Sequence, residues 1–284
     1  MRWDYGSVYK EIRRAKKLSQ AQVCGDYLNR STLVRFENNE TVPSYEHMHF
    51  LLQQVDMTFE EFEFICYSYH PSQSQQLLYE IDNLKFPSRQ KMEEIVAQCQ
   101  ELLKRQPDSV PIERRMCLLQ AVLELQEPSK NSKNIIDRLL WTELSSYDIW
   151  YHQDILLIGS IIGHFPIENL EVVSDLLLKH LEKYKDYKNI QITTLSLYRQ
   201  LSNIFLTHHL TEKTQFFAEK TIQLAKEQKR YDYLATGRIY LGLATNDTQL
   251  VQAGLDLLTN TEENDWLAKM QHVIETHKNS HQKQ

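Results

Sequence analysis

The sequence predicts an all-α protein, and three observations carry this prediction. Only 7 Gly and 7 Pro occur among 284 residues, too few for the many turns of a β-sandwich or the glycine-rich loops of a nucleotide-binding fold. Apolar residues recur three and four positions apart through most of the chain, which is the spacing of one helix face. With 42% hydrophobic and 25% charged residues, the chain can bury a core in one large domain or two ordinary ones.

The same sequence argues against several classes of protein. No apolar run approaches the roughly 20 residues that span a bilayer, and residues 1–14 contain no apolar secretory stretch, so we expect a cytoplasmic protein with no membrane partner. The four cysteines are widely spaced without a CxxC pair, which indicates reduced, mostly buried thiols. None of the phosphate-loop, dinucleotide-fold, serine-hydrolase or zinc-protease motifs occurs. We therefore expect no catalytic residue, no metal, no cofactor and no enzymatic activity.

Five short helices are predicted within the first 66 residues, which makes a compact bundle. Their apolar positions are Val8 and Ile12 in the first, Ala21, Val23 and Cys24 in the second, Leu33 and Phe36 in the third, Met48, Leu51, Leu52 and Val55 in the fourth, and Phe59, Phe62 and Ile65 in the fifth. Pro43 and Ser44 begin the fourth helix, and Thr58 caps the fifth. Ser19 and Asn29 stand where they would cap the second and third helices.

The charge of this bundle is divided between its two halves. From Lys10 to Arg35 there are seven basic residues and two acidic ones, whereas from Phe36 to Cys66 there are seven acidic residues and no Lys or Arg. The net charge of −6 argues against a protein that coats nucleic acid. Taken alone, such charge runs solvate helix faces as often as they bind a partner, so their interpretation depends on the motif in which they lie.

The segments KKLSQAQVC and LNRSTLVRFENNETVPS resemble the helix-turn-helix of the Cro/repressor (XRE) type. They supply the Leu-Ser-Gln opening of the second helix, the Arg-Phe-Glu end of the third, and a Pro-Ser start to the fourth. Asn39 stands where the pattern usually has Gly. Asn tolerates the left-handed backbone conformation expected there, so the turn is retained.

The resemblance implies that the third helix enters the major groove of DNA while the second crosses the phosphates. Arg30, Ser31 and Arg35 are then the candidates for reading base edges, because Arg can bond guanine O6 and N7 together. The candidates for phosphate contacts are Arg14, Lys17, Gln20, Thr32 and Asn38. For Arg14 and Lys17 the alternative is plain solvation. Similar domains pair an Arg of the first helix with the Glu that ends the third, so Arg13 and Glu37 are expected to form a structural ion pair.

A wider resemblance, to the Rgg/GadR/MutR (RopB-like) family of Gram-positive transcriptional regulators, extends over YGSVYKEIRRAKKLSQAQVCGDYLNRSTLVRFENNETVPS and LLQQVDMTFEEFEFI. It implies a DNA-binding domain, a short linker, and a tetratricopeptide-like domain that binds a secreted and reimported peptide pheromone, as in quorum sensing. Over the rest of the chain the similarity covers length and helicity rather than diagnostic motifs.

Residues 68–75 are polar and interrupted by Pro71, and we predict a linker there. It separates a helix-turn-helix domain at 1–67 from a helical-repeat domain at 76–284 that binds the ligand and dimerises. Residues 216–244 have the alanines, aromatic residues and length of a tetratricopeptide unit. Dimer contacts are expected from apolar residues near the chain end: Leu255, Leu257, Leu258, Trp266, Leu267 and Met270.

A concave stack of helix pairs suits an extended peptide. Such a ligand needs amides or hydroxyls for its backbone, aromatic residues for its apolar side chains, and a charge for one terminus. Helices expected over 145–165 and 190–209 offer these groups as Trp150, Tyr151, Gln153 and Asp154 on the first, and Tyr198, Arg199 and Asn203 on the second. The alternative for Trp150 and Tyr198 is a place in the core.

The leading hypothesis is a sequence-specific DNA-binding transcriptional regulator, a homodimer on a palindromic operator, that is controlled by a short hydrophobic peptide. Two alternatives stay open. One is a helical-repeat scaffold for protein partners, and the other is a repressor that needs no peptide.

Overall fold

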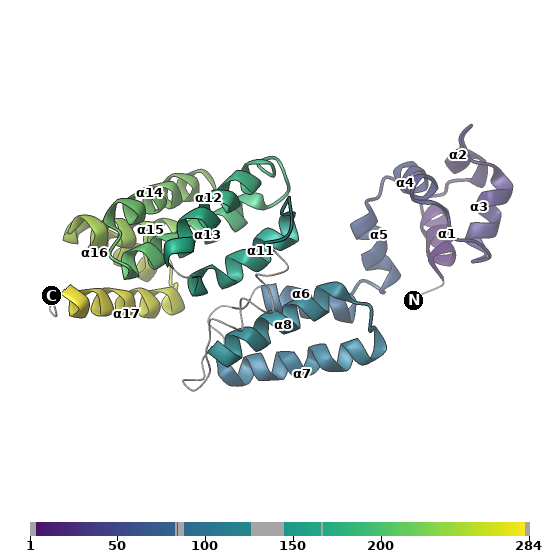
Figure 1. Ribbon diagram of the computed structural model, residues 1–284. Coiled ribbons are helices and arrows are strands. Elements are labelled where there is room, and N and C mark those ends of the chain that lie inside the picture. Colours follow the sequence, from purple (N-terminus) through teal and green to yellow (C-terminus); the bar gives the residue numbers. More distant parts are fainter. Residues whose placement is uncertain (1–3, 83, 85–87, 126–144, 166, 282–284) are drawn as a thin grey trace. The chain divides into compact units, whose positions relative to one another are not determined.

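The computed structural model describes residues 4–82, 84, 88–125, 145–165 and 167–281. Every regular element in these segments is helical (Figure 1), so the all-α prediction is confirmed. Contacts divide the chain into two compact units, Met1–Met116 and Cys117–Gln284. Each unit is described by itself below.

The first unit begins with the predicted five-helix bundle. Its helices are α1 (Tyr5–Ala15), α2 (Gln20–Cys24), α3 (Arg30–Glu37), α4 (Tyr45–Gln54) and α5 (Phe59–Cys66). Here α3 packs on α1 and α2, and α5 packs on α1 and α4. The caps predicted at Ser19 and Thr58 are confirmed, because each side-chain oxygen accepts a backbone N–H of its helix. Ser44, predicted to begin the fourth helix, caps α4 in the same way. Asn29 holds the N-cap position of α3, but its side chain makes no capping bond there in the described structure, so that prediction is wrong in its chemistry.

The core of the bundle contains most of the predicted apolar positions, but Ala21 is exposed and Ile65 is only half-buried. Tyr9 is fully buried and donates its hydroxyl to the Leu51 carbonyl at 3.0 Å, whereas the predicted Val8 is half-buried. Tyr9 was missed because a hydroxyl-bearing ring is not counted in an apolar pattern, although it is buried readily once it has an acceptor. Phe59, predicted to be in the core, is 38% exposed and stacks its ring on Tyr45.

Three further helices follow the bundle: α6 (Gln73–Asp82), α7 (Arg89–Arg105) and α8 (Val110–Leu125). The boundary between the two units falls within α8. The polar stretch predicted as a linker is partly helical. Ser72 and Gln75 form reciprocal bonds, Gln75 N to Ser72 Oγ at 3.2 Å and Ser72 N to Gln75 Oε1 at 2.8 Å, which begin α6. This is a capping box, and it gives a polar sequence a reason to start a helix. Cys99 of α7 is buried, as are Cys24 and Cys66 in the bundle, in agreement with the prediction for the cysteines.

The second unit is a succession of helices with short connections. They are α11 (His152–Ile161), the 3₁₀ turn η2 (Ile162–His164), α12 (Ile167–Glu182), α13 (Ile190–Thr207), α14 (Thr211–Glu227), α15 (Tyr231–Thr245), α16 (Thr248–Asn260) and α17 (Asn264–His281). From α13 onward two or three residues join each helix to the next, which makes neighbours antiparallel. The predicted tetratricopeptide unit is the pair α14 and α15. The two helices pack closely at Gly237, which has no side chain. A Cβ atom at this position would lie only 3.3 Å from the Ala218 carbonyl oxygen.

The chain end contributes to this core. Six residues near the chain end were predicted to form dimer contacts. Three of them, Leu258, Trp266 and Met270, are instead buried in the core of the second unit. No helix in the described segments is both long enough and apolar enough to cross a membrane.

Candidate nucleic-acid interface and ligand groove

The helix-turn-helix places the three predicted base-reading residues on α3. Arg30 and Ser31 occupy the first turn of α3, and Arg35 lies in its last turn. All three are exposed. Arg35 has one acidic neighbour, Glu40, at 3.8 Å, and both of these side chains are more than half exposed.

A buried ion pair holds α1 to the end of α3. Arg13 donates from Nε to Glu37 Oε1 at 2.6 Å and from Nη2 to Glu37 Oε2 at 2.9 Å. Its Nη1 donates to the Leu18 carbonyl at 2.7 Å. The structural ion pair expected from the resemblance is therefore present in the structure, in bidentate form.

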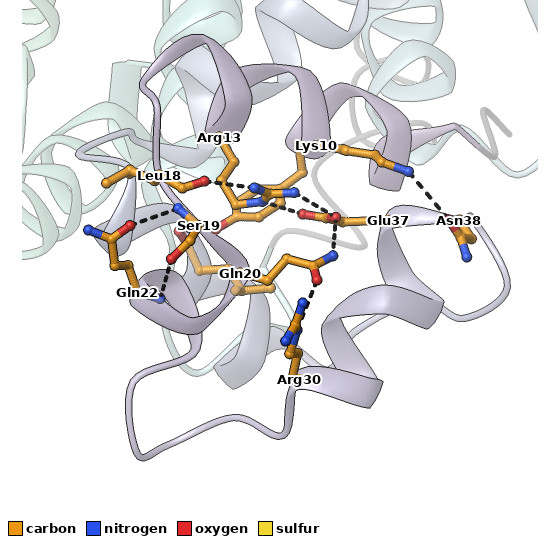
Figure 2. Close-up of polar contacts among 11 residues, drawn as sticks. Lys10, Arg13, Leu18, Ser19, Gln20, Gln22, Arg30, Glu37 and Asn38 are labelled. Carbon is orange, nitrogen blue, oxygen red and sulfur yellow. Dashed lines mark hydrogen bonds and ion pairs between the residues drawn. The ribbon is translucent and has the colours of Figure 1, made fainter.

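The same carboxylate begins a chain of contacts that reaches Arg30, at the exposed start of α3 (Figure 2). Gln20 Nε2 donates to Glu37 Oε2 at 2.8 Å, and Arg30 Nε donates to Gln20 Oε1 at 3.1 Å. Gln20, expected only at a phosphate, thus links the buried pair to Arg30. Each Gln20 atom in this chain has one possible role, since the amide N donates and the amide O accepts, so its orientation is fixed from both ends.

The electrostatics follow from this arrangement. Burial by itself would raise the pKa of Glu37, but the hydrogen bonds from Arg13 and Gln20 and the charge of Arg13 together hold that pKa below its ordinary value. The hydrogen bond to Glu37 likewise raises the pKa of Arg13. Both groups are therefore charged at neutral pH.

Asn39 has a role that the sequence did not reveal. Its backbone is left-handed, with φ of 59°, as predicted for a residue that replaces Gly. Its side-chain Oδ1 also accepts from Gly6 N at 2.9 Å and from Ser7 N at 3.2 Å. Asn39 thus caps the start of α1, whose own N-cap, Asp4, makes no side-chain cap bond in the described structure. Gly6 permits the approach, since a Cβ there would lie 1.7 Å from the Phe36 carbonyl oxygen.

The remaining phosphate candidates differ in their surroundings. Arg14 and Lys17 are exposed, and Thr32 is half-buried. Asn38 accepts from Lys10 Nζ at 3.5 Å and donates to Glu40 at 3.3 Å. The basic side chains of α1 and α3 are thus at the surface, with the exception of Arg13.

Of the four ligand residues predicted before α13, two are buried and support the fold. Trp150 is 3% exposed, with its ring 5.3 Å from that of His180, so a ligand cannot reach it without a rearrangement. Asp154 is buried and accepts from Tyr151 N at 3.0 Å at the start of α11. Tyr151 and Gln153 are exposed. The helix predicted over 145–165 begins only at residue 152 because Asp154 closes its first turn there.

The residues predicted on α13 lie on two sides of that helix. Tyr198 is half-buried beside Phe217 and lines a pocket of about 370 Å³ among α12, α13 and α14. Arg199 and Asn203 instead meet Tyr240 of α15. The Tyr240 hydroxyl donates to Asn203 Oδ1 at 3.3 Å, and the Arg199 guanidinium lies beside the same hydroxyl.

Tyr240 is the residue of this region that sequence reasoning missed. It is fully buried, and burial raises its pKa. Helices α13, α15 and α17 contact one another in succession, so alternate helices line one side of the stack. In a stack of helix pairs, every second helix lines the same side. This rule could have identified Tyr240 as a neighbour of Asn203, but only by assuming in advance that α13 packs on α15.

Comparison with solved structures identifies the fold. The chain matches a candidate transcriptional regulator from Listeria monocytogenes with a TM-score of 0.77 at 17% identity, over 98% of each chain. It matches the SHP pheromone receptor Rgg2 of Streptococcus dysgalactiae with a TM-score of 0.71 at 18% identity, over 96% of this chain and 99% of that one. It also matches PlcR of Bacillus thuringiensis, solved with the peptide PapR7 and DNA, with a TM-score of 0.64 at 14% identity, over 97% and 99%.

No protein-family model and no curated protein sequence matches the chain. The structural matches nevertheless cover almost the whole length of both aligned chains, so they include the bundle as well as the helical stack. The predicted fold, a helix-turn-helix domain joined to tetratricopeptide-like helices, is therefore confirmed, and it is the fold of these regulators.

Proposed function

We propose that the chain is a sequence-specific DNA-binding transcriptional regulator whose activity is controlled by a short peptide bound in the second unit. The observation that carries the proposal is the chain of contacts from Arg13 through Glu37 and Gln20 to Arg30, which orients an exposed cation at the start of α3. The same fold occurs in a pheromone receptor and in a regulator solved with peptide and DNA, which supports both parts of the proposal.

In this function α3 reads the major groove through Arg30, Ser31 and Arg35, while Arg14 and Lys17 contact phosphates. One bundle covers half of a palindromic operator, so the active form is a homodimer. The proposal places the protein in the cytoplasm, where the chromosome lies, and assigns it regulation rather than catalysis.

Selection of bound sequences from random DNA duplexes tests the first part. We expect one palindromic sequence to be enriched, with affinity that falls steeply as salt is raised. A protein-interaction scaffold would bind every duplex weakly and enrich no sequence. Synthetic peptides encoded beside the gene then test the second part, since a regulator that needs no peptide would bind its operator equally with and without them.

A further inference from the structure

Two cationic side chains from different helices meet at one indole ring in the second unit. The Cζ atom of Arg199, on α13, lies 4.6 Å from the ring centroid of Trp266 on α17. The Nζ atom of Lys269, one turn further along α17, lies 5.8 Å from the same ring. Trp266 is 6% exposed, so both charges lie against the core rather than in open water.

This arrangement is electrostatically unfavourable by itself. Burial, and then the charge of Arg199, lower the pKa of Lys269 to about 8. Arg199 forms no ion pair with any residue that the structure describes, and its Nε is buried without a hydrogen-bond partner there. A desolvated guanidinium N–H and two adjacent like charges are each costly. One bound anion would offset both costs.

We propose that Arg199 and Lys269 form a receptor for a carboxylate of the ligand. The inference rests on the proposed function in one respect, namely that the carboxylate belongs to a peptide. The planar guanidinium can donate two parallel bonds to a carboxylate, and the lysine adds a point charge. Trp266 and Tyr240 fix the Arg199 side chain from two sides, so little rotamer freedom is lost on binding.

The adjoining surface suits the residue that carries the carboxylate. Asn203, which accepts from Tyr240, also lines a hollow of about 200 Å³ between α13 and α17 together with Leu206 and Val273. Its amide oxygen is occupied by Tyr240, which leaves its N–H groups to donate to a peptide carbonyl. The carboxylate is either the C-terminus of the peptide or an acidic side chain within it.

Three small probes test the site without knowledge of the peptide. N-acetyl-leucine has a terminal carboxylate, N-acetyl-leucinamide has none, and N-acetyl-aspartate α-amide has only a side-chain carboxylate. The full-length protein is labelled with ¹⁵N, and each probe is titrated while the indole N–H signal of Trp266, assigned by its loss in Trp266→Phe, is followed. We expect the signal to move with at least one acid and not with the amide. The acid that binds more tightly identifies the source of the carboxylate.

Two variants make the test specific. Arg199→Gln should weaken binding of the acid about tenfold or more, as expected for the loss of a charge-assisted bond. Lys269→Met should weaken it less and leaves the contact of Arg199 with Tyr240 in place, so it serves if Arg199→Gln unfolds. A Trp266 signal that ignores all three probes, or moves equally with the amide, would overturn the proposal. If peptides alter DNA binding but the Trp266 signal does not respond to the probes, only the carboxylate site is refuted. If the Trp266 signal responds but peptides have no effect on DNA binding, only the regulatory function is refuted.

Discussion

Glu37 accepts two hydrogen bonds from Arg13 across 24 positions of sequence, with both side chains almost completely buried. Glu37→Gln should therefore destabilise the bundle by about 3 to 5 kcal/mol, because it leaves Arg13 buried without its counter-ion. Urea unfolding of the full chain, followed by circular dichroism, measures this loss. The exposed substitution Glu46→Gln is the control, and the double variant Arg13→Met with Glu37→Leu should recover much of the stability. If the double variant is as unstable as Glu37→Gln, the loss of stability does not come from leaving the Arg13 charge buried without its counter-ion.

The same pair predicts a pH dependence. The pKa of Glu37 is held below its ordinary value of 4.5, so the folded state holds this proton more weakly than the unfolded state does. Its stabilising contribution is complete above pH 4.5 and is lost as the pH falls through the lower, folded pKa. The stability difference between wild type and Glu37→Gln should accordingly narrow in acid. A constant difference from pH 7 to pH 3 would show that the carboxylate stays charged or was never the source of the difference.

Arg35→Ala should reduce affinity for the selected operator much more than affinity for scrambled DNA, because a base-edge contact carries sequence information. Lys17→Ala is the matched variant and should weaken both complexes about equally, lowering the salt slope by about one. Fluorescence anisotropy on the two duplexes at several salt concentrations measures both effects. If Arg35→Ala weakens the two complexes equally, Arg35 belongs with the phosphate contacts.

Asn39→Gly should destabilise the protein although Gly is the usual residue at this turn. Gly accepts the left-handed backbone but removes the Oδ1 that caps Gly6 and Ser7, at a cost of about 1 kcal/mol. Asn39→Ala loses the cap and also strains the backbone, so it should cost about 1 kcal/mol more. Thermal unfolding of the three proteins gives the order. A stabilised Asn39→Gly would mean that the cap contributes nothing.

Lys269 predicts a pH dependence of the opposite kind. Its pKa is about 8 in the folded protein against an ordinary 10.5, so the unfolded chain binds this proton more tightly between those values. The fold therefore gains stability from this group as the pH rises from 8 toward 10.5. Urea unfolding at pH 7 and pH 9.5 should show wild type gaining on Lys269→Met, with the exposed Lys278→Met as control. If the stability of Lys269→Met and that of Lys278→Met change by the same amount between the two pH values, the lowered pKa of Lys269 is refuted.

The fold could be predicted from the sequence to the extent that it is local. Helix caps such as Ser19 and Thr58 act within four residues, and apolar spacing identifies the buried face of each helix. The pairing of Arg13 with Glu37 came from resemblance, since nothing in the spacing of two charged residues indicates that they meet.

The parts that escaped prediction depend on contacts between distant helices. Asn39 caps α1 by accepting from Gly6 and Ser7, which precede it by 33 and 32 positions in the sequence. Tyr240 donates to Asn203 across a separation of 37 positions. A polar side chain gives no sign in the sequence of which distant backbone or hydroxyl it will satisfy. The spacing of Arg199 and Asn203 predicted that they share one face of α13, and both lie beside Tyr240, a neighbour that the sequence did not indicate.

The division of charge within the bundle has a kinetic consequence. Exposed cations lie on α1 and α3, whereas Glu46, Glu61 and Glu63 are exposed on α4 and α5, where no Lys or Arg occurs. In the field of a polyanion such a body experiences a torque that turns its basic side inward before any contact is made. Productive encounters would then form a larger share of all collisions, and the advantage would fade as added salt shortens the reach of the field. Under the proposed function, the acidic half of the bundle would thus speed association with DNA without touching it.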